Sequence, residues 1–141
     1  TIPKQSKETS QVNLIPMAGK GSRFKDSGYR LGKPMIPVKD KPMVITACES
    51  FPHASKWIFL PRKDDFNKYP IAKALNEFHS NCNVILVDHD TSGQVATCLL
   101  AESELLPNAP LFIASCDYET VYSGMDTALQ RYFQIFRKCL A

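Results

Sequence analysis

The stretch VNLIPMAGKGSRF, which runs from Val12 to Phe24, decides the fold of this 141-residue chain. Its first half, Val12–Met17, predicts a strand that is apolar on both faces, and its second half is a loop of small and basic residues. Short continuous apolar runs are typical of central parallel strands covered on both sides. Three later runs have the same character: Trp57–Leu60, Val84–Val87 and Leu111–Ala114.

Helical patterns follow each of these runs. The expected helices are Met43–Phe51 after Pro42, Asp64–His79 kinked or split at Pro70, Gln94–Leu105 with Val95, Leu99, Ala101 and Leu105 on one side, and a final amphipathic Met125–Leu140. The alternation of strand and helix predicts a three-layer α/β fold with a mainly parallel sheet.

Composition and charge limit the function. The composition, with 44% apolar and 22% charged residues, is that of an ordinary globular protein. The 141 residues are enough for one domain with a buried core. A net charge of +3 without a long Lys/Arg run argues against a nucleic-acid partner but allows a local anion site. No apolar run approaches membrane-spanning length, and the N-terminus lacks a signal core, so we expect a cytoplasmic protein without a membrane partner. We expect residues 1–11 to be a disordered leader or linker and residues 12–141 to be the domain.

The cysteines do not form a recognisable framework. There are five of them, an odd number, and no Cys-x-x-Cys pair occurs. A zinc site or a set of disulfides is therefore not predicted. We expect reduced thiols that pack as small apolar residues.

Ligands of parallel sheets usually bind at the carboxyl ends of the strands, so the residues after each apolar run carry the functional prediction. After the first run comes the glycine loop, residues 18–23. Its Gly19 and Gly21 allow the backbone to approach a ligand and can turn N–H groups toward phosphate oxygens. Arg23 adds a forked cation. The loop matches neither a Walker P-loop nor a dinucleotide fingerprint. The alternative to a phosphate-binding loop is a tight strand-to-helix turn with solvated charges.

Lys33 lies ten residues after Arg23 and directly precedes Pro34. Because Pro34 restricts the preceding backbone, we expect Lys33 to be extended and rigidly placed. Lys-Pro alone is usually a surface turn, but next to the glycine loop it supplies a second cation for the same phosphates.

The segment after the third run, Asp88-His89-Asp90-Thr91-Ser92-Gly93-Gln94, invites a metal interpretation. Adjacent residues of an extended segment point to opposite faces, so the acidic triplet is a poor chelate. Thr91 or Ser92 is expected to cap the next helix, and Gly93 would let a flat base approach.

After the fourth run comes Ser115-Cys116-Asp117. Asp117 suits Mg²⁺, which commonly takes one or two carboxylates together with substrate phosphates; the alternative is an aspartate that caps a turn. Cys116 has no evident histidine to activate it, so we expect a packed thiol. The strand ends together therefore offer equipment for phosphoryl or nucleotidyl transfer, which needs positioning and charge neutralisation.

Three segments carry a family resemblance. IPMAGKGSRFKDSGYRLGKPMIPVKDKPM resembles the opening signature of the sugar-phosphate nucleotidyltransferases, the NDP-sugar pyrophosphorylase family, while DTSGQVATCLLAESELL and APLFIASCD resemble two later segments. The resemblance covers residues 12 to 120 and implies a Rossmann-like, GT-A-type fold. It implies transfer of NMP from an NTP to a phosphorylated acceptor, with sugar 1-phosphates the commonest and phosphocholine-like acceptors also known, and release of pyrophosphate.

The resemblance also implies roles for individual residues. Arg23 and Lys33 would be catalytic, with Arg23 stabilising the triphosphate as pyrophosphate leaves and Lys33 holding donor and acceptor phosphates. Asp117 would bind Mg²⁺. The other implied nucleotide contacts are Gly19, Lys20, Gly21 and Ser22 at the phosphates, and Ala18, Gly93 and Gln94 near the base and ribose.

Two departures from the family pattern affect this interpretation. Tyr118-Glu119 follows Asp117, and the family's catalytic domain is about twice as long as this chain. We therefore expect the N-terminal, nucleotide-binding half of such an enzyme, apparently truncated. The alternative is a non-catalytic nucleotide-binding or interaction module. An uncovered apolar face would make the isolated chain self-associate, so a homo-oligomer is expected.

Overall fold

The computed structural model describes residues 10–117, except for the side chains of Arg23 and Phe24. Within these residues, four parallel strands form one sheet in the order β5-β4-β1-β6. The strands are β1 (Val12–Met17), β4 (Lys56–Pro61), β5 (Cys82–Val84) and β6 (Leu111–Ile113). The expected helix Met125–Leu140 and residues 1–9 of the expected leader lie outside the described residues.

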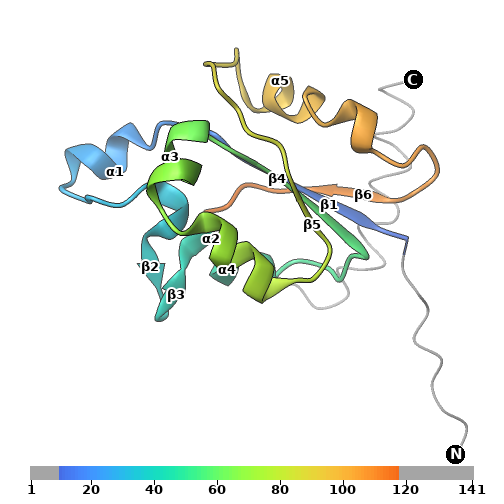
Figure 1. The fold of residues 1–141 in the computed structure, drawn as a ribbon, viewed down its shortest axis with the longest axis horizontal. Coiled ribbons are helices and arrows are strands. Elements are labelled where there is room, and N and C mark those ends of the chain that lie inside the picture. Colours follow the sequence, from blue (N-terminus) through green and yellow to red (C-terminus); the bar gives the residue numbers. More distant parts are fainter. Residues whose placement is uncertain (1–9, 118–141) are drawn as a thin grey trace, which may run out of the picture.

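Helices cover both faces of the sheet (Figure 1). Below it in Figure 1 lie α2 (Met43–Glu49) and α4 (Ile71–Phe78), and above it lies α5 (Gln94–Leu99), followed by the 3-10 turn Glu102–Glu104. The helix α3 (Lys63–Lys68) lies at the left end of the sheet. The three-layer α/β prediction is therefore confirmed. Pro70 splits the expected helix 64–79 into α3 and α4, as predicted.

The core has one half on each face because side chains alternate along the central strands. Ile15 and Phe59 pack toward α2 and α4, whereas Leu14 and Ile58 pack toward α5. All four side chains are fully buried. Burying such a side chain stabilises the fold by about 1.5–3 kcal/mol, so β1 and β4 form the rigid centre of the domain.

The third strand lies earlier than expected. β5 covers residues 82–84, yet its pairing to β4 continues, since the N–H groups of Ile85 and Val87 donate to the carbonyls of Phe59 and Pro61 at 2.9 Å each. The predicted run 84–87 thus belongs to the same extended segment.

The helix expected over 94–105 ends at Leu99, and its expected apolar face is correct for only two of its four residues. Val95 and Leu99 are 69% and 57% exposed. Ala101 is buried and Leu105 half-buried, as expected, but Thr97 is buried in place of Val95 and Leu99, because the chain leaves the α-helix before residue 101.

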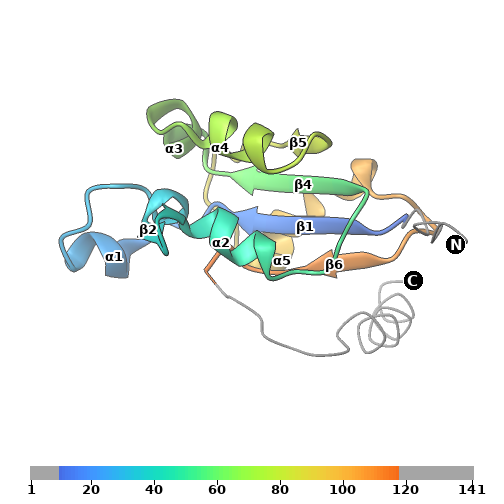
Figure 2. The same cartoon turned by 90° about the horizontal axis from the view of Figure 1, so that it is seen from below.

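Three elements precede α2 that the apolar pattern did not predict. They are the short helix α1 (Ser22–Asp26), the 3-10 turn Lys33–Met35 and the hairpin of β2 (Pro37–Val38) with β3 (Lys41–Pro42). Figure 2 shows α1 and β2 beyond the arrowheads of β1 and β4, at the carboxyl edge of the sheet. None of the helices in residues 10–117 is long and apolar enough to span a bilayer.

Candidate functional site

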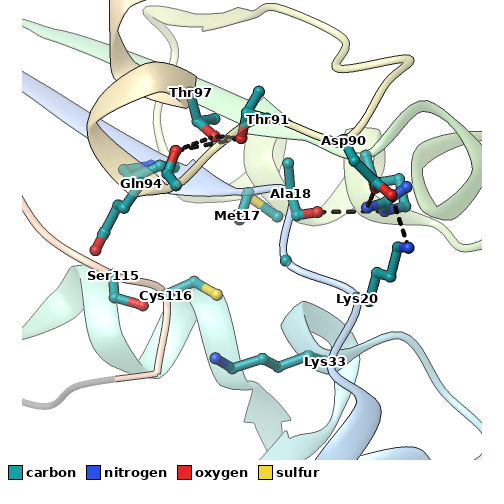
Figure 3. Close-up of a pocket in the computed structure, with 14 residues that line it drawn as sticks. Met17, Ala18, Lys20, Lys33, Asp90, Thr91, Gln94, Thr97, Ser115 and Cys116 are labelled. Atoms are coloured by element: carbon teal, nitrogen blue, oxygen red, sulfur yellow. Dashed lines mark hydrogen bonds and ion pairs between the residues drawn. The ribbon is translucent and has the colours of Figure 1, made fainter.

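A cavity of about 500 Å³ opens at the carboxyl end of β1 (Figure 3). β1 is the point where the chain reverses direction across the sheet, since β4 and β5 lie on one side of it and β6 on the other. Open parallel sheets bind ligands at such switch points, beyond the carboxyl ends of the strands. The lining residues are Pro16, Met17, Ala18, Gly19, Lys20, Lys33, Arg62, Asp90, Thr91, Gly93, Gln94, Thr97, Ser115 and Cys116.

The glycine loop forms one wall of this cavity. Gly21 has φ +60°, which a side chain rarely tolerates, and a Cβ built there would lie 3.2 Å from the Cβ of Lys33. Glycine at this position therefore lets the loop pack closely on Lys33. Lys25 N–H donates to the Gly21 carbonyl at 3.1 Å, so the loop leads directly into α1.

Lys33 lies on another side of the cavity and points toward it (Figure 3). The expectation of an extended Lys33 is wrong, because Lys33 begins a 3-10 turn closed by hydrogen bonds from Met35 to Gly32 and from Ile36 to Lys33. Pro34 is compatible with this turn, since neither bond needs a donor at position 34. The hydrogen bonds of the 3-10 turn, rather than an extended backbone before Pro34, therefore hold Lys33 in place.

Asp117 contacts Lys33 across the end of β6. The Lys33 Nζ lies 2.7 Å from Asp117 Oδ2, and the Ser115 hydroxyl donates to Asp117 Oδ1. Burial raises the pKa of Asp117, but the hydrogen bonds from Lys33 and Ser115 outweigh it, so the pKa is lowered from its ordinary value. Asp117 is therefore ionised at neutral pH.

The loop between β5 and α5 forms the opposite wall, and its acidic triplet is divided. Asp88 pairs with its neighbour His89 at 2.8 Å, whereas Asp90 lies between Lys20 and Arg62. Across residues 10–117, no three His, Cys, Asp or Glu side chains gather as a metal site. The two aspartates thus serve different partners.

The expected helix cap is wrong. Gly93 occupies the N-cap of α5, and no side-chain cap bond is made. The Thr91 and Thr97 hydroxyls instead share a hydrogen bond of 2.6 Å, and the Gly93 carbonyl lies 3.2 Å from both and accepts from the one whose proton is free. Since Thr97 is buried, this network fixes the wall that carries Gly93 and Gln94.

Most of the predicted site residues meet at the cavity: Ala18, Gly19, Lys20, Lys33, Gly93 and Gln94. Gly21 and Asp117 contact Lys33 rather than line the cavity. Ser22 begins α1 and is not a lining residue. The Arg23 side chain lies outside the described part of the chain.

Sequence reasoning missed Arg62. Its Nε donates to the Ala18 carbonyl at 3.2 Å, and its Nη2 donates to Asp90 Oδ1 at 2.7 Å. The signal was available, because Arg62 directly follows β4 and so stands at a strand end, where the other candidates were found. Among the described lining residues, the basic side chains are therefore Lys20, Lys33 and Arg62.

Cys116 lines the cavity but is only 2% exposed. Burial raises the pKa of its thiol to about 11, although nearby Lys33 acts in the opposite direction. The prediction of a packed thiol is confirmed. Of the other described cysteines, Cys48 is buried, and Cys82 and Cys98 are half-buried.

No protein-family model matches this sequence, and no curated protein matches it by sequence. Solved structures do match the fold. A nucleoside-diphosphate-sugar pyrophosphorylase from Vibrio cholerae RC9 has a TM-score of 0.63 at 22% identity, and the match covers 82% of this chain and 52% of the other. A nucleotidyl transferase from Methanothermobacter thermautotroptrophicus has a TM-score of 0.64 at 15% identity, covering 89% and 57%.

A more distant match has the same architecture. The 4-diphosphocytidyl-2C-methyl-D-erythritol synthase from Anaerococcus prevotii has a TM-score of 0.54 at 14% identity, covering 77% of this chain and 44% of the other. The chain therefore has the α/β fold found in these nucleotidyltransferases, and it spans about half of their length.

Proposed function

We propose that this chain forms the NTP-binding part of a nucleotidyltransferase that moves NMP from an NTP to a phosphorylated acceptor and releases pyrophosphate. The observation that carries the proposal is the cation-lined cavity at the switch point, built on a glycine loop that packs against Lys33. The fold shared with solved nucleotidyltransferases supports it. A sugar 1-phosphate is the proposed acceptor.

The residues at the cavity suit this chemistry. Lys33 and Lys20 would neutralise the triphosphate, and backbone N–H groups of the glycine loop would contact its oxygens. We assign Arg23 to the leaving pyrophosphate on the sequence motif. Ala18, Gly93 and Gln94, which line the cavity, would contact the base and ribose.

A phosphorylated acceptor also fits a mechanism in which none of the proposed site residues acts as a general base. A phosphate monoester has a second pKa of about 6, so it is already a dianion at neutral pH. It can attack the α-phosphorus in line without losing a proton to the protein. An alcohol acceptor would require a general base.

Asp117 is the proposed Mg²⁺ ligand. A single carboxylate with an adjacent hydroxyl, Ser115, fits a cation that completes its shell with water and substrate phosphates. When bound, Mg²⁺ would supply charge stabilisation at the phosphates. The Lys33 amine, which now contacts Asp117, would then be shared between this carboxylate and the phosphates.

Calorimetry with ATP, GTP, CTP, UTP and dTTP, each with and without Mg²⁺, tests the donor site. We expect base-selective binding that Lys33→Met weakens at least about tenfold, which corresponds to about 1.4 kcal/mol. Lys41→Met is the matched control, because Lys41 pairs with Glu49 away from the cavity. No binding of any NTP, or equal binding by Lys33→Met and the wild type, would contradict the proposal.

Pyrophosphate release then tests the acceptor. Because one structural neighbour is named as a 4-diphosphocytidyl-2C-methyl-D-erythritol synthase, the screen includes non-sugar phosphates such as phosphocholine beside sugar 1-phosphates. Nucleotide binding without turnover on any acceptor would instead favour a non-catalytic nucleotide-binding module.

A further inference from the structure

Asp90 holds two of the three cations that line the cavity in the described structure. Its Oδ2 lies 2.7 Å from Lys20 Nζ, and its Oδ1 accepts a hydrogen bond of 2.7 Å from Arg62 Nη2. Lys20 belongs to the glycine loop, Arg62 follows β4, and Asp90 belongs to the loop before α5. One carboxylate thus joins three separate segments at the cavity (Figure 3).

The three partners are held to different extents. The Arg62 side chain is 21% exposed and is also fixed by its bond to the Ala18 carbonyl. Lys20 and Asp90 are 63% and 57% exposed. Exposed ion pairs are weak, so the carboxylate can be replaced at low cost by a stronger anion. Arg62, in contrast, has a bond to the Ala18 carbonyl that does not involve Asp90.

The chemistry favours such a replacement. Hydrogen bonds from Lys20 and Arg62 lower the pKa of Asp90 to about 2, so it is an anion at neutral pH. A guanidinium binds a phosphate with the same forked geometry that it uses for a carboxylate. A polyphosphate offers several oxygens and more charge than one carboxylate, and Lys33 lies on the same cavity.

We propose that Asp90 is an internal counter-anion that occupies part of the cation site and is displaced by an incoming polyphosphate. This inference rests on the proposed function, because it assumes that the cavity binds the phosphate chain of a nucleotide. It assigns to Asp90 the role of setting the affinity for that chain. Removing the carboxylate therefore tightens polyphosphate binding.

Asp88 provides a matched control. It carries the same charge two residues earlier, but it pairs with His89 and does not line the cavity. Asp88→Asn changes the net charge of the protein as Asp90→Asn does. A difference between the two variants therefore reports the position of the carboxylate rather than the overall charge.

The test is calorimetry with inorganic triphosphate in EDTA, so that no divalent cation takes part. We expect Asp90→Asn and Asp90→Ser to bind triphosphate about threefold to tenfold more tightly than wild type, and Asp88→Asn to bind like wild type. In a Lys20→Met background, the gain from Asp90→Asn should be smaller, since the two residues act together.

Unchanged or weaker binding by both Asp90 variants, with wild type still binding, would overturn this inference and leave the proposed function standing. Weaker binding would mean that Asp90 arranges the two cations for the ligand. If neither wild type nor the Asp90 variants bind triphosphate, this inference fails, and the proposed function is judged separately by the NTP titrations with Mg²⁺. Binding by the Asp90 variants alone would support the inference.

Discussion

Gly21→Ala tests the packing of the glycine loop on Lys33. An alanine at φ +60° costs about 1–2 kcal/mol of backbone strain, and its Cβ would stand 3.2 Å from the Cβ of Lys33. Loop or lysine must then shift by a few tenths of an ångström. We therefore expect a loss of about 1–2 kcal/mol in the free energy of unfolding, together with weaker nucleotide binding.

Two other glycines separate the causes of that loss. Gly28 has φ +85° with no atom within 4 Å of a built Cβ, so Gly28→Ala should cost strain of about 1–2 kcal/mol without affecting binding. Gly19 has an open Cβ position and no left-handed φ, so Gly19→Ala should be nearly neutral in stability.

Urea unfolding measures the stability of the three variants, and calorimetry with the best-binding NTP measures their affinity. The reasoning is refuted if Gly21→Ala is as stable as Gly19→Ala, because the strain argument then fails. It is also refuted if Gly28→Ala weakens nucleotide binding as much as Gly21→Ala, because the contact with Lys33 would then be irrelevant.

Three further predictions concern the walls of the cavity. Because the pKa of Asp117 is lowered, its ion pair with Lys33 stabilises the fold above the ordinary pKa of 3.8, and this stabilisation is lost as the pH falls through the lowered pKa. In urea unfolding, Asp117→Asn should therefore destabilise the protein at neutral pH and progressively less below pH 3.8. Thr97→Val should cost about 1 kcal/mol in urea unfolding because it removes the Thr97 hydroxyl from its contacts with Thr91 and the Gly93 carbonyl, whereas Thr97→Ser should not. Cys116 should resist iodoacetamide at neutral pH until urea unfolds the protein, as mass spectrometry of the labelled peptides would show.

Each of these has a contrary outcome. A destabilisation by Asp117→Asn that stays constant with pH would mean that the ion pair is not the cause. Equal stability of the valine and serine variants at position 97 would make the hydroxyl network irrelevant. Rapid labelling of Cys116 in the folded protein would show that the thiol is reactive.

The sheet could be predicted from the sequence because its central strands, β1 and β4, are buried on both faces. The run Leu111–Ala114 is a continuous apolar stretch, and the run Val12–Met17 is interrupted by a single polar residue, Asn13. The chemistry of proline predicts the break at Pro70. The α5 face could not be predicted this way. Val95 and Leu99 fit a helical period, but the helix is too short to bring Ala101 onto the same side.

The hairpin of β2 and β3 has strands of only two residues, so it leaves no periodic signal. The candidate site was predicted where a motif marks it, as at Lys33. Asp90 and Arg62 could not be paired in advance, because they lie 28 residues apart and meet only through the order of the strands. The rule about strand ends would have found Arg62, had it been applied to β4.

The most direct test of the central claim is a map of backbone amide shifts by NMR as the best-binding NTP is added to the chain. The account predicts the largest shifts at residues 18–21, at Lys33 and at residues 93–94, which line or support one cavity. Lys33→Met should reduce these shifts at equal nucleotide concentration. Shifts confined to other surfaces, such as the hairpin 37–42, or no shifts at all, would contradict the claim that this cavity binds a nucleotide.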